Sequence, residues 1–338
     1  MRIPRSPASL ANPRIPPALS RCATPRATDV QAEQLPAAAV VAAVVAADAA
    51  AVLAAVADIR EVIMDFYRNK LALITGGSSG IGLALARQIL LNGGHVAILA
   101  RRADVLETAA KELANSKRTP DQKIFTLQAD VSNKTEVENA LSGFIVANGA
   151  PDMVFNSAGV AHPGRFEDLG DGIFHWMMDV NYFGTVNVLK VLVPLMQQRK
   201  SGVIVNISSI AGFIGVYGYT AYGASKFAVN GFSDALRSEL KPDGIQVSIV
   251  FPPDTDTPQL TYESQFKPAV TKEIAGSAKL LDPNLVALET LKAVARKQYI
   301  VLPGGEGKLM YWLHHFVGRL LYPIMDMMVN SAMKKSKK

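Results

Sequence analysis

From residue 70 to residue 302, short apolar runs alternate with longer stretches that have helical periodicity. The apolar runs are nearly continuous, which is typical of strands buried on both faces of a parallel sheet. We therefore predict an α/β fold: a Rossmann-type, doubly wound parallel sheet of about seven strands, with helices on both faces. The predicted strands are 71–75, 95–100, 123–128, 152–156, 203–208, 245–251 and 298–302, and the predicted helices are 81–92, 103–116, 134–147, 173–198, 223–240 and 283–296.

The chain before this pattern, residues 1–63, is a leader of different composition. Its first 34 residues are rich in Pro, Arg, Ser and Ala, and we expect them to be disordered. Residues 35–57 are alanine-rich and long enough to cross a bilayer, but Asp48 near their centre argues against spanning. A transit peptide, a weak anchor and an over-extended start ahead of Met64 all stay open.

Residues 64–307 are predicted to form one folded domain, and residues 308–338 an amphipathic helix with a lysine-rich tail. Apolar residues recur from Leu309 with a period of about 3.6, and Pro323 is expected to kink the helix. With lysines following, this pattern favours a helix that lies in a membrane interface. A helix that closes over a substrate site, or that contacts a second subunit, is the alternative.

The formal net charge of +6 comes from the two ends of the chain. Residues 1–28 carry five arginines and no acid, and the last five residues carry four lysines, so the middle lies near −3. A nucleic-acid partner would require clustered basic residues on the folded body, and none is predicted. The single cysteine, Cys22, argues against a disulfide scaffold and a Cys-ligated metal, and no metal site is predicted.

A glycine-rich turn stands between the first predicted strand and the first predicted helix. Glycines let the backbone approach a pyrophosphate, and the helix N-terminus offers N–H groups and the positive end of its dipole. This placement predicts a dinucleotide site, although a turn of this composition alone is also compatible with a tight turn. The candidate cofactor-binding residues here are Gly76, Ser78, Ser79, Gly80, Ile81 and Gly82.

The second predicted strand is followed by Arg101, nineteen residues beyond Gly82. An acidic residue at this place binds the ribose 2′-hydroxyl of NAD, whereas a guanidinium suits a 2′-phosphate. Ser78 and Ser79 would add hydroxyl contacts to that phosphate. The sequence therefore predicts NADPH/NADP+ as the cofactor, with a solvated basic loop as the alternative.

Further cofactor candidates follow the third and fourth predicted strands, at the edge where open α/β sheets bind ligands. The carboxylate of Asp130 is placed to accept a hydrogen bond from an adenine amino group. Each motif alone is also compatible with ordinary loop chemistry. The candidates at this edge are Asp130, Val131, Asn156, Ala158 and Gly159.

Tyr222 and Lys226 lie four residues apart, on one face of a predicted helix, and Ser209 precedes the tyrosine by thirteen residues. A nearby ammonium is expected to lower the pKa of a tyrosine, which suits general acid–base work. Ser209 would hydrogen-bond a substrate oxygen as a carbonyl is reduced. Asn181, inside the helix predicted at 173–198, would satisfy a kinked backbone or hold a water in a proton relay.

Together these motifs resemble the short-chain dehydrogenase/reductases over about residues 68–303. The resemblance implies an NADP-dependent oxidoreductase with a catalytic tetrad of Asn181, Ser209, Tyr222 and Lys226. It also implies that Lys226 holds the nicotinamide ribose, beside Tyr222, and that the chain forms a homo-oligomer. A non-catalytic, NADP-sensing binding module is a remote alternative.

The run Pro252–Pro258 resembles the 3-ketodihydrosphingosine reductases of that family. The resemblance implies NADPH-dependent reduction of a long-chain lipid ketone in sphingolipid metabolism, with Thr255 and Thr257 near the nicotinamide. It also implies membrane association on the cytoplasmic side, at the endoplasmic reticulum in a eukaryote, with a cytoplasmic location as the alternative. The chain departs from that group at Ile210 and at Gln259–Leu260, so a 3-oxoacyl thioester or a steroid-like ketone stays open as substrate.

Overall fold

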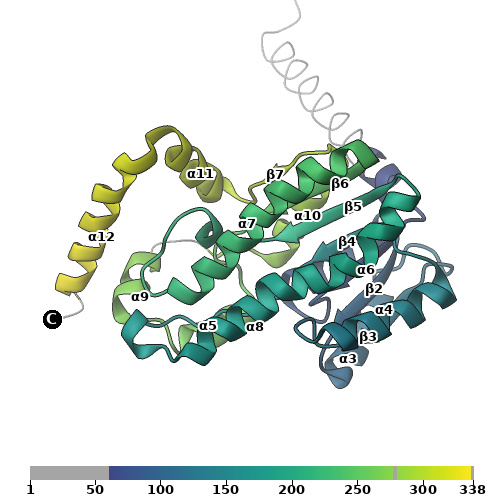
Figure 1. The fold of residues 1–338 in the computed structure, drawn as a ribbon, viewed down its shortest axis with the longest axis horizontal. Coiled ribbons are helices and arrows are strands. Elements are labelled where there is room, and N and C mark those ends of the chain that lie inside the picture. Colours follow the sequence, from purple (N-terminus) through teal and green to yellow (C-terminus); the bar gives the residue numbers. More distant parts are fainter. Residues whose placement is uncertain (1–60, 277–279, 336–338) are drawn as a thin grey trace, which may run out of the picture. The chain divides into compact units, whose positions relative to one another are not determined.

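A computed structural model of the chain describes residues 61–276 and 280–335 (Figure 1). The predictions for residues 1–60, including the disordered leader and the alanine-rich stretch, lie outside the described residues. Residues 61–67 are helical, and Ile63 and Tyr67 are buried in the core. Within the described residues, packing against the folded domain thus includes Ile63, one residue ahead of Met64.

The described residues form a seven-stranded parallel sheet in the order β3-β2-β1-β4-β5-β6-β7. This arrangement confirms the predicted doubly wound α/β fold. The strand order reverses between β1 and β4, where Thr75 is the register partner of Asn156. The strands are β1 (Leu71–Thr75), β2 (His95–Ala100), β3 (Ile124–Gln128), β4 (Met153–Asn156), β5 (Gly202–Ile207), β6 (Ile245–Val250) and β7 (Ile300–Val301).

Helices cover both faces of the sheet (Figure 1). Successive strand side chains point to opposite faces, so Ile74 packs toward α2 and α10, whereas Leu73 packs toward α4 and α6. The helices are α2 (Gly80–Leu91), α3 (Ala103–Ala114), α4 (Lys134–Asn148), α5 (Asp171–Met178), α6 (Gly184–Gln198), α7 (Thr220–Leu240), α8 (Pro258–Ser264), α9 (Ala269–Ala275), α10 (Pro283–Ala295), α11 (Gly305–Val317) and α12 (Leu321–Lys335).

The helix predicted at 173–198 is interrupted by a π-helical turn, Asp179–Phe183, between α5 and α6. A π turn leaves local carbonyl groups out of the regular ladder, and such turns occur frequently at functional sites. Asn181 lies in this turn and is buried. The structure thus confirms helix on both sides of Asn181, but with a local change of hydrogen bonding.

The C-terminal segment consists of two helices rather than one kinked helix. The break lies at Gly318, which has φ +56, a conformation that glycine adopts readily. Pro323 lies in the first turn of α12, where its missing N–H has no intrahelical partner to lose, so the kink predicted there is wrong. Among residues 61–276 and 280–335, no helix combines the length and apolarity needed to cross a membrane.

Candidate active site

A cavity of about 400 Å³ opens at the carboxyl ends of β1, β4 and β5. Its wall extends from the glycine-rich turn, past the end of β5 and the start of α7, to α8 and α11. It brings together most of the residues that the sequence nominated. Those lining it are Gly76, Ser79, Gly80, Ile81, Gly82, Gly159, Ser209, Tyr222, Lys226, Thr255 and Thr257.

The glycine-rich turn is packed so closely that side chains would not fit. A Cβ on Gly82 would lie 2.3 Å from the carbonyl oxygen of Gly76. Gly76 itself has φ +65, and a Cβ on it would lie 2.8 Å from Cα of Ala158. Ser79, at the N-cap of α2, makes no side-chain capping bond, so the first N–H groups of that helix face the cavity uncapped. This cradle fits a pyrophosphate.

The remaining cofactor candidates lie outside the lining of this cavity. Arg101 follows β2 and pairs with Asp130, with Nη1 and Oδ2 3.6 Å apart, and its side chain is 57% exposed. Val131 is buried, and its carbonyl accepts a hydrogen bond from Asn187. Ser78 is half-buried beside Ser79 in the glycine-rich turn.

Asn156 is held inside the sheet rather than in the cavity. It is 3% exposed, and its Nδ2 donates to Oδ1 of Asn206 at 2.8 Å. Asn206 in turn donates to Ser233 on α7, so the chain of amides ties β4 and β5 to that helix. Ala158, two residues on, donates its backbone N–H to Thr75. These contacts set the path of the loop after β4.

Tyr222 lies on the first turn of α7 with 9% of its surface exposed. Burial and, next, the negative charge of Glu263 raise its pKa above the ordinary value of a tyrosine. Hydrogen bonds to the side chains of Ser209 and Gln259 oppose that rise. The phenol is therefore protonated at neutral pH and able to donate a proton, and the lowered pKa expected from the nearby ammonium is wrong.

Lys226 is 6% exposed, and its Nζ lies 5.7 Å from the ring centroid of Tyr222. Nζ donates to the carbonyl oxygen of Ile207, at the end of β5, at 2.9 Å. Burial lowers the pKa of Lys226 to about 8. The raised pKa of Tyr222 is instead explained by desolvation of the phenol itself, its largest cause, followed by the charge of Glu263.

Asn181 links the loop after β4 to α7. Its Oδ1 accepts from the N–H of Val160 at 2.8 Å, and its Nδ2 donates to the carbonyl of Val160 at 2.9 Å. The same Nδ2 donates to Oγ of Ser225 at 2.8 Å, and Ser225 donates to the carbonyl of Tyr222. Both amide hydrogens are therefore used within the protein, and the side chain positions the helix that carries Tyr222.

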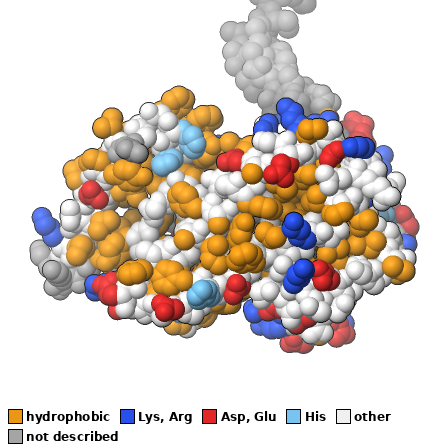
Figure 2. Space-filling view, viewed as in Figure 1, with side chains coloured by type: hydrophobic (Ala, Val, Ile, Leu, Met, Phe, Trp, Pro, Cys, Tyr) orange, Lys and Arg blue, Asp and Glu red, His pale blue; other side chains and the backbone are white. Residues whose placement is uncertain are grey.

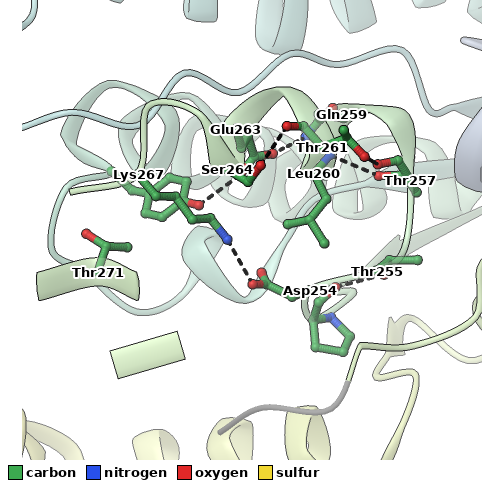
Figure 3. A network of polar contacts seen from close by, with 12 residues as sticks. Asp254, Thr255, Thr257, Gln259, Leu260, Thr261, Glu263, Ser264, Lys267 and Thr271 are labelled. Atoms are coloured by element: carbon green, nitrogen blue, oxygen red, sulfur yellow. Dashed lines mark hydrogen bonds and ion pairs between the residues drawn. The ribbon is translucent and has the colours of Figure 1, made fainter. Parts of the chain in front are cut away.

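A buried polar network on and around α8, shown in Figure 3, also contributes to the lining of the cavity. Glu263, 6% exposed, accepts a hydrogen bond from the hydroxyl of Tyr219 at 2.8 Å and from Nε2 of Gln259 at 2.9 Å. Lys267 donates instead to Asp254, at 3.1 Å. Thr257 caps α8 through the N–H of Leu260, and Thr255 donates to the carbonyl of Pro253.

The sequence between residues 70 and 267 matches the family model described as short chain dehydrogenase. The chain belongs to that family. It is therefore an oxidoreductase, and the cavity described above lies where open α/β sheets bind their ligands.

Similar proteins extend the comparison. The 3-ketodihydrosphingosine reductase of Bos taurus is 36% identical over 239 residues, which are 70% of this chain and 72% of that protein. The protein of the same name from Dictyostelium discoideum is 36% identical over 69% of this chain and 74% of its own length. A dehydrogenase/reductase SDR family protein 7-like from Anopheles gambiae is 34% identical over 76% and 82%.

Solved structures share the fold. A short-chain dehydrogenase from Sphingobium yanoikuyae in complex with NADPH gives a TM-score of 0.61 at 25% identity, covering 69% of this chain and 86% of that one. An alcohol dehydrogenase from the archaeon Thermococcus sibiricus, complexed with 5-hydroxy-NADP, gives 0.58 at 28% identity, covering 69% and 94%.

Sequence reasoning missed four residues of this site in this short-chain dehydrogenase. Tyr219 precedes Tyr222 by one helical turn, and that spacing was a usable signal. Ser225 lies inside the Tyr–Lys motif, yet only its contacts show its role. Glu263 and Gln259 lie on a short helix that was not predicted, and nothing in the surrounding sequence indicated that they face the cavity.

Proposed function

We propose that this short-chain dehydrogenase catalyses the NADPH-dependent reduction of 3-ketodihydrosphingosine to dihydrosphingosine, a step of sphingolipid biosynthesis. The observation that carries the proposal is the similarity to proteins of that function: curated 3-ketodihydrosphingosine reductases of cow, mouse and Dictyostelium are 35–36% identical over 69–70% of this chain. The cavity supports it, because it places Tyr222 and Ser209 beside an apolar wall.

The cofactor we propose is NADPH, with its pyrophosphate at the N-terminus of α2. The close packing at Gly76 and Gly82 supports this placement, since only bare backbone leaves room there. Arg101 and Asp130 would hold the adenosine end, with the guanidinium toward the 2′-phosphate. Lys226, Thr255 and Thr257 would hold the nicotinamide end. Bound NADPH supplies the hydride that reduces the carbonyl carbon.

Tyr222 is the proton donor in the proposed mechanism. Its phenol is protonated at neutral pH, so it can deliver a proton to the substrate oxygen as negative charge develops there. The hydroxyl of Ser209, which lines the same cavity as Tyr222, would share that oxygen and stabilise the charge. Lys226 orients the reacting groups from the other side of the ring, and Asn181 keeps α7 in register with the loop after β4.

The apolar part of the cavity fits an alkyl chain. Ile210, Val216, Leu260 and Met310 line it, and Met310 belongs to α11, whose outer face is exposed. A long chain bound at the ketone would therefore leave the cavity toward the C-terminal helices. This direction supports a lipid ketone over a short acyl group, which would leave that apolar wall empty.

We propose that α11 and α12 contact a membrane surface, from which the lipid substrate is taken. Tyr311 packs one side of α11 against Phe213 and Phe251. The other side and α12 expose large apolar side chains, which gather over this part of the molecule in Figure 2. The exposed residues of this segment are Leu309, Met310, Trp312, Leu313, Phe316, Leu320, Tyr322, Ile324, Met327, Met328 and Met333. Association on the cytoplasmic side and assembly into a homo-oligomer stay predictions.

The test offers the full-length protein 3-ketodihydrosphingosine and a short 3-oxoacyl thioester side by side, in detergent, and follows NADPH oxidation. Turnover of the sphingoid ketone with a kcat/KM well above that of the thioester is expected. Turnover of the thioester alone would overturn the proposed substrate while leaving the reaction type in place. Tyr222→Phe serves as the control that ties the signal to this site.

A further inference from the structure

Glu263 is a buried carboxylate in the wall of the substrate cavity. It lies on α8, and Figure 3 shows it among Gln259, Lys267 and Asp254. The same cavity is lined by Ser209 and Tyr222, the residues between which a substrate carbonyl oxygen would be held. A charged group at this place therefore faces the reacting end of the substrate.

The hydrogen bonds of Glu263 come from neutral groups. Oε2 accepts from the hydroxyl of Tyr219, and Oε1 accepts from the amide of Gln259. Among the residues that the structure describes, no cation forms an ion pair with it. Lys267, which follows α8, pairs with Asp254 and acts on Glu263 only through its charge at a distance. A buried carboxylate without a paired cation is costly, and burial raises the pKa of Glu263. A cationic partner would offset that cost.

Tyr219 connects Glu263 to the reacting centre. Glu263 accepts a hydrogen bond from Tyr219 at 2.8 Å, and the ring centroids of Tyr219 and Tyr222 lie 5.6 Å apart. In 3-ketodihydrosphingosine the amine stands on the carbon next to the carbonyl carbon. If the carbonyl oxygen is bound to Tyr222, the amine must lie within a few ångströms of that phenol, and the chain continues on the other side of the carbonyl.

We propose that Glu263 binds the cationic amine of an α-amino ketone and so selects sphingoid ketones over ketones that lack the amine. The inference rests on the proposed function and adds a specificity-determining residue to it. Glu263 accepts hydrogen bonds from two neutral donors, so its negative charge has no paired cation. An ammonium would supply that cation, and a hydrogen bond between two charged groups is among the stronger ones.

The pairing would also act on the proton donor. The negative charge of Glu263 is the second cause, after burial, of the raised pKa of Tyr222. An ammonium bound to Glu263 offsets that charge and makes the phenol a better acid in the complex with an amine-bearing substrate. A ketone without the amine leaves the charge in place, so we expect it to have a lower kcat as well as a higher KM.

The experiment compares Glu263→Gln with the unchanged full-length protein on two substrates: 3-ketodihydrosphingosine and its desamino analogue of the same chain length. The amide is the same size. Its oxygen can still accept from Tyr219, and its Nε2 can donate to Oε1 of Gln259 once the Gln259 amide turns over, so the fold should hold. The variant is expected to lose about 10- to 100-fold in kcat/KM on the amine-bearing ketone. On the desamino ketone it should change less than about threefold, or improve.

Glu239→Gln makes the same chemical change at an exposed position of α7 and is expected to leave both values unchanged. NADPH titration and thermal unfolding of each variant show that the protein is intact. An equal loss on both ketones, or no loss on either, would overturn the role of Glu263 while the proposed function stands. Failure of the unchanged protein to reduce the sphingoid ketone would overturn the proposed substrate, and this inference with it.

Discussion

The guanidinium of Arg101 pairs with the carboxylate of Asp130, with Nη1 and Oδ2 3.6 Å apart, at the ends of two adjacent strands. Both side chains reach solvent, so the pair itself contributes little stability. In the proposed NADPH complex, the pair would hold the guanidinium at the adenosine end of the dinucleotide, where it would face the 2′-phosphate.

Arg101→Asp is expected to weaken NADPH binding by about 10- to 100-fold, because one charge-assisted contact is lost and a like charge is added. NADH binding should change far less. Fluorescence titration with each nucleotide measures both dissociation constants. Arg102→Asp, the same change at the next residue, is the matched control. A preference for NADPH over NADH that is lost only in Arg102→Asp would place the 2′-phosphate at Arg102 instead.

Tyr222→Phe removes the proposed proton donor and should lower kcat by about 10²- to 10⁴-fold. NADPH affinity should stay within about threefold, because the ring and its packing remain. Tyr182→Phe, on the π-helical turn, is the control for removing one phenol. Normal turnover in Tyr222→Phe would contradict the mechanism.

Lys226 gives the reaction an alkaline limit. Its pKa in the folded protein is lowered to about 8 by burial, so the ammonium is lost as the pH rises through about 8. If the ammonium is needed, kcat/KM should fall with a single ionisation near that pH. The unfolded chain keeps this proton up to about pH 10.4. The free energy of unfolding should therefore rise with pH between about 8 and about 10.4. A pH profile of kcat/KM that is flat up to about pH 10 would exclude the assignment.

Trp312→Ser combined with Phe316→Ser should reduce binding to anionic lipid vesicles, measured by co-sedimentation, by about 10-fold or more. Trp312 and Phe316 stack on α11 with their ring centroids 5.6 Å apart, and Phe316 is 82% exposed. Val146→Ser on α4 removes an equally exposed apolar side chain and should have no effect. Unchanged vesicle binding in the double variant would count against the membrane surface.

Asn181→Ala should lower the free energy of unfolding in urea by about 1–3 kcal/mol, because the N–H and C=O of Val160 and the hydroxyl of Ser225 lose a buried partner. If Asn181 positions α7, kcat should fall as well, with KM nearly unchanged. Asn148→Ala, an exposed asparagine at the end of α4, is the control. A normal kcat in a destabilised Asn181→Ala protein would limit the residue to stability.

Buried strands could be located from sequence because their apolar runs end where the chain turns. The predicted 71–75 and 95–100 match β1 and β2 residue for residue. The short helices α8 and α9 were missed, although Thr257 followed by Pro258 is a capping residue before a proline at the first helical position. Seven-residue helices carry too little periodicity to be recognised by pattern.

The sequence by itself determined the sheet, the glycine-rich turn and the Tyr222–Lys226 pair, because each depends on residues close together in the chain. Only the tertiary structure decided what surrounds that pair: Glu263 hydrogen-bonds Tyr219 across 44 residues. The tertiary structure also reversed the direction of the pKa shift expected for Tyr222, from lowered to raised. Local spacing predicts the attraction of two charges, but the loss of solvation on burial depends on everything packed around them, and here that loss is the larger effect.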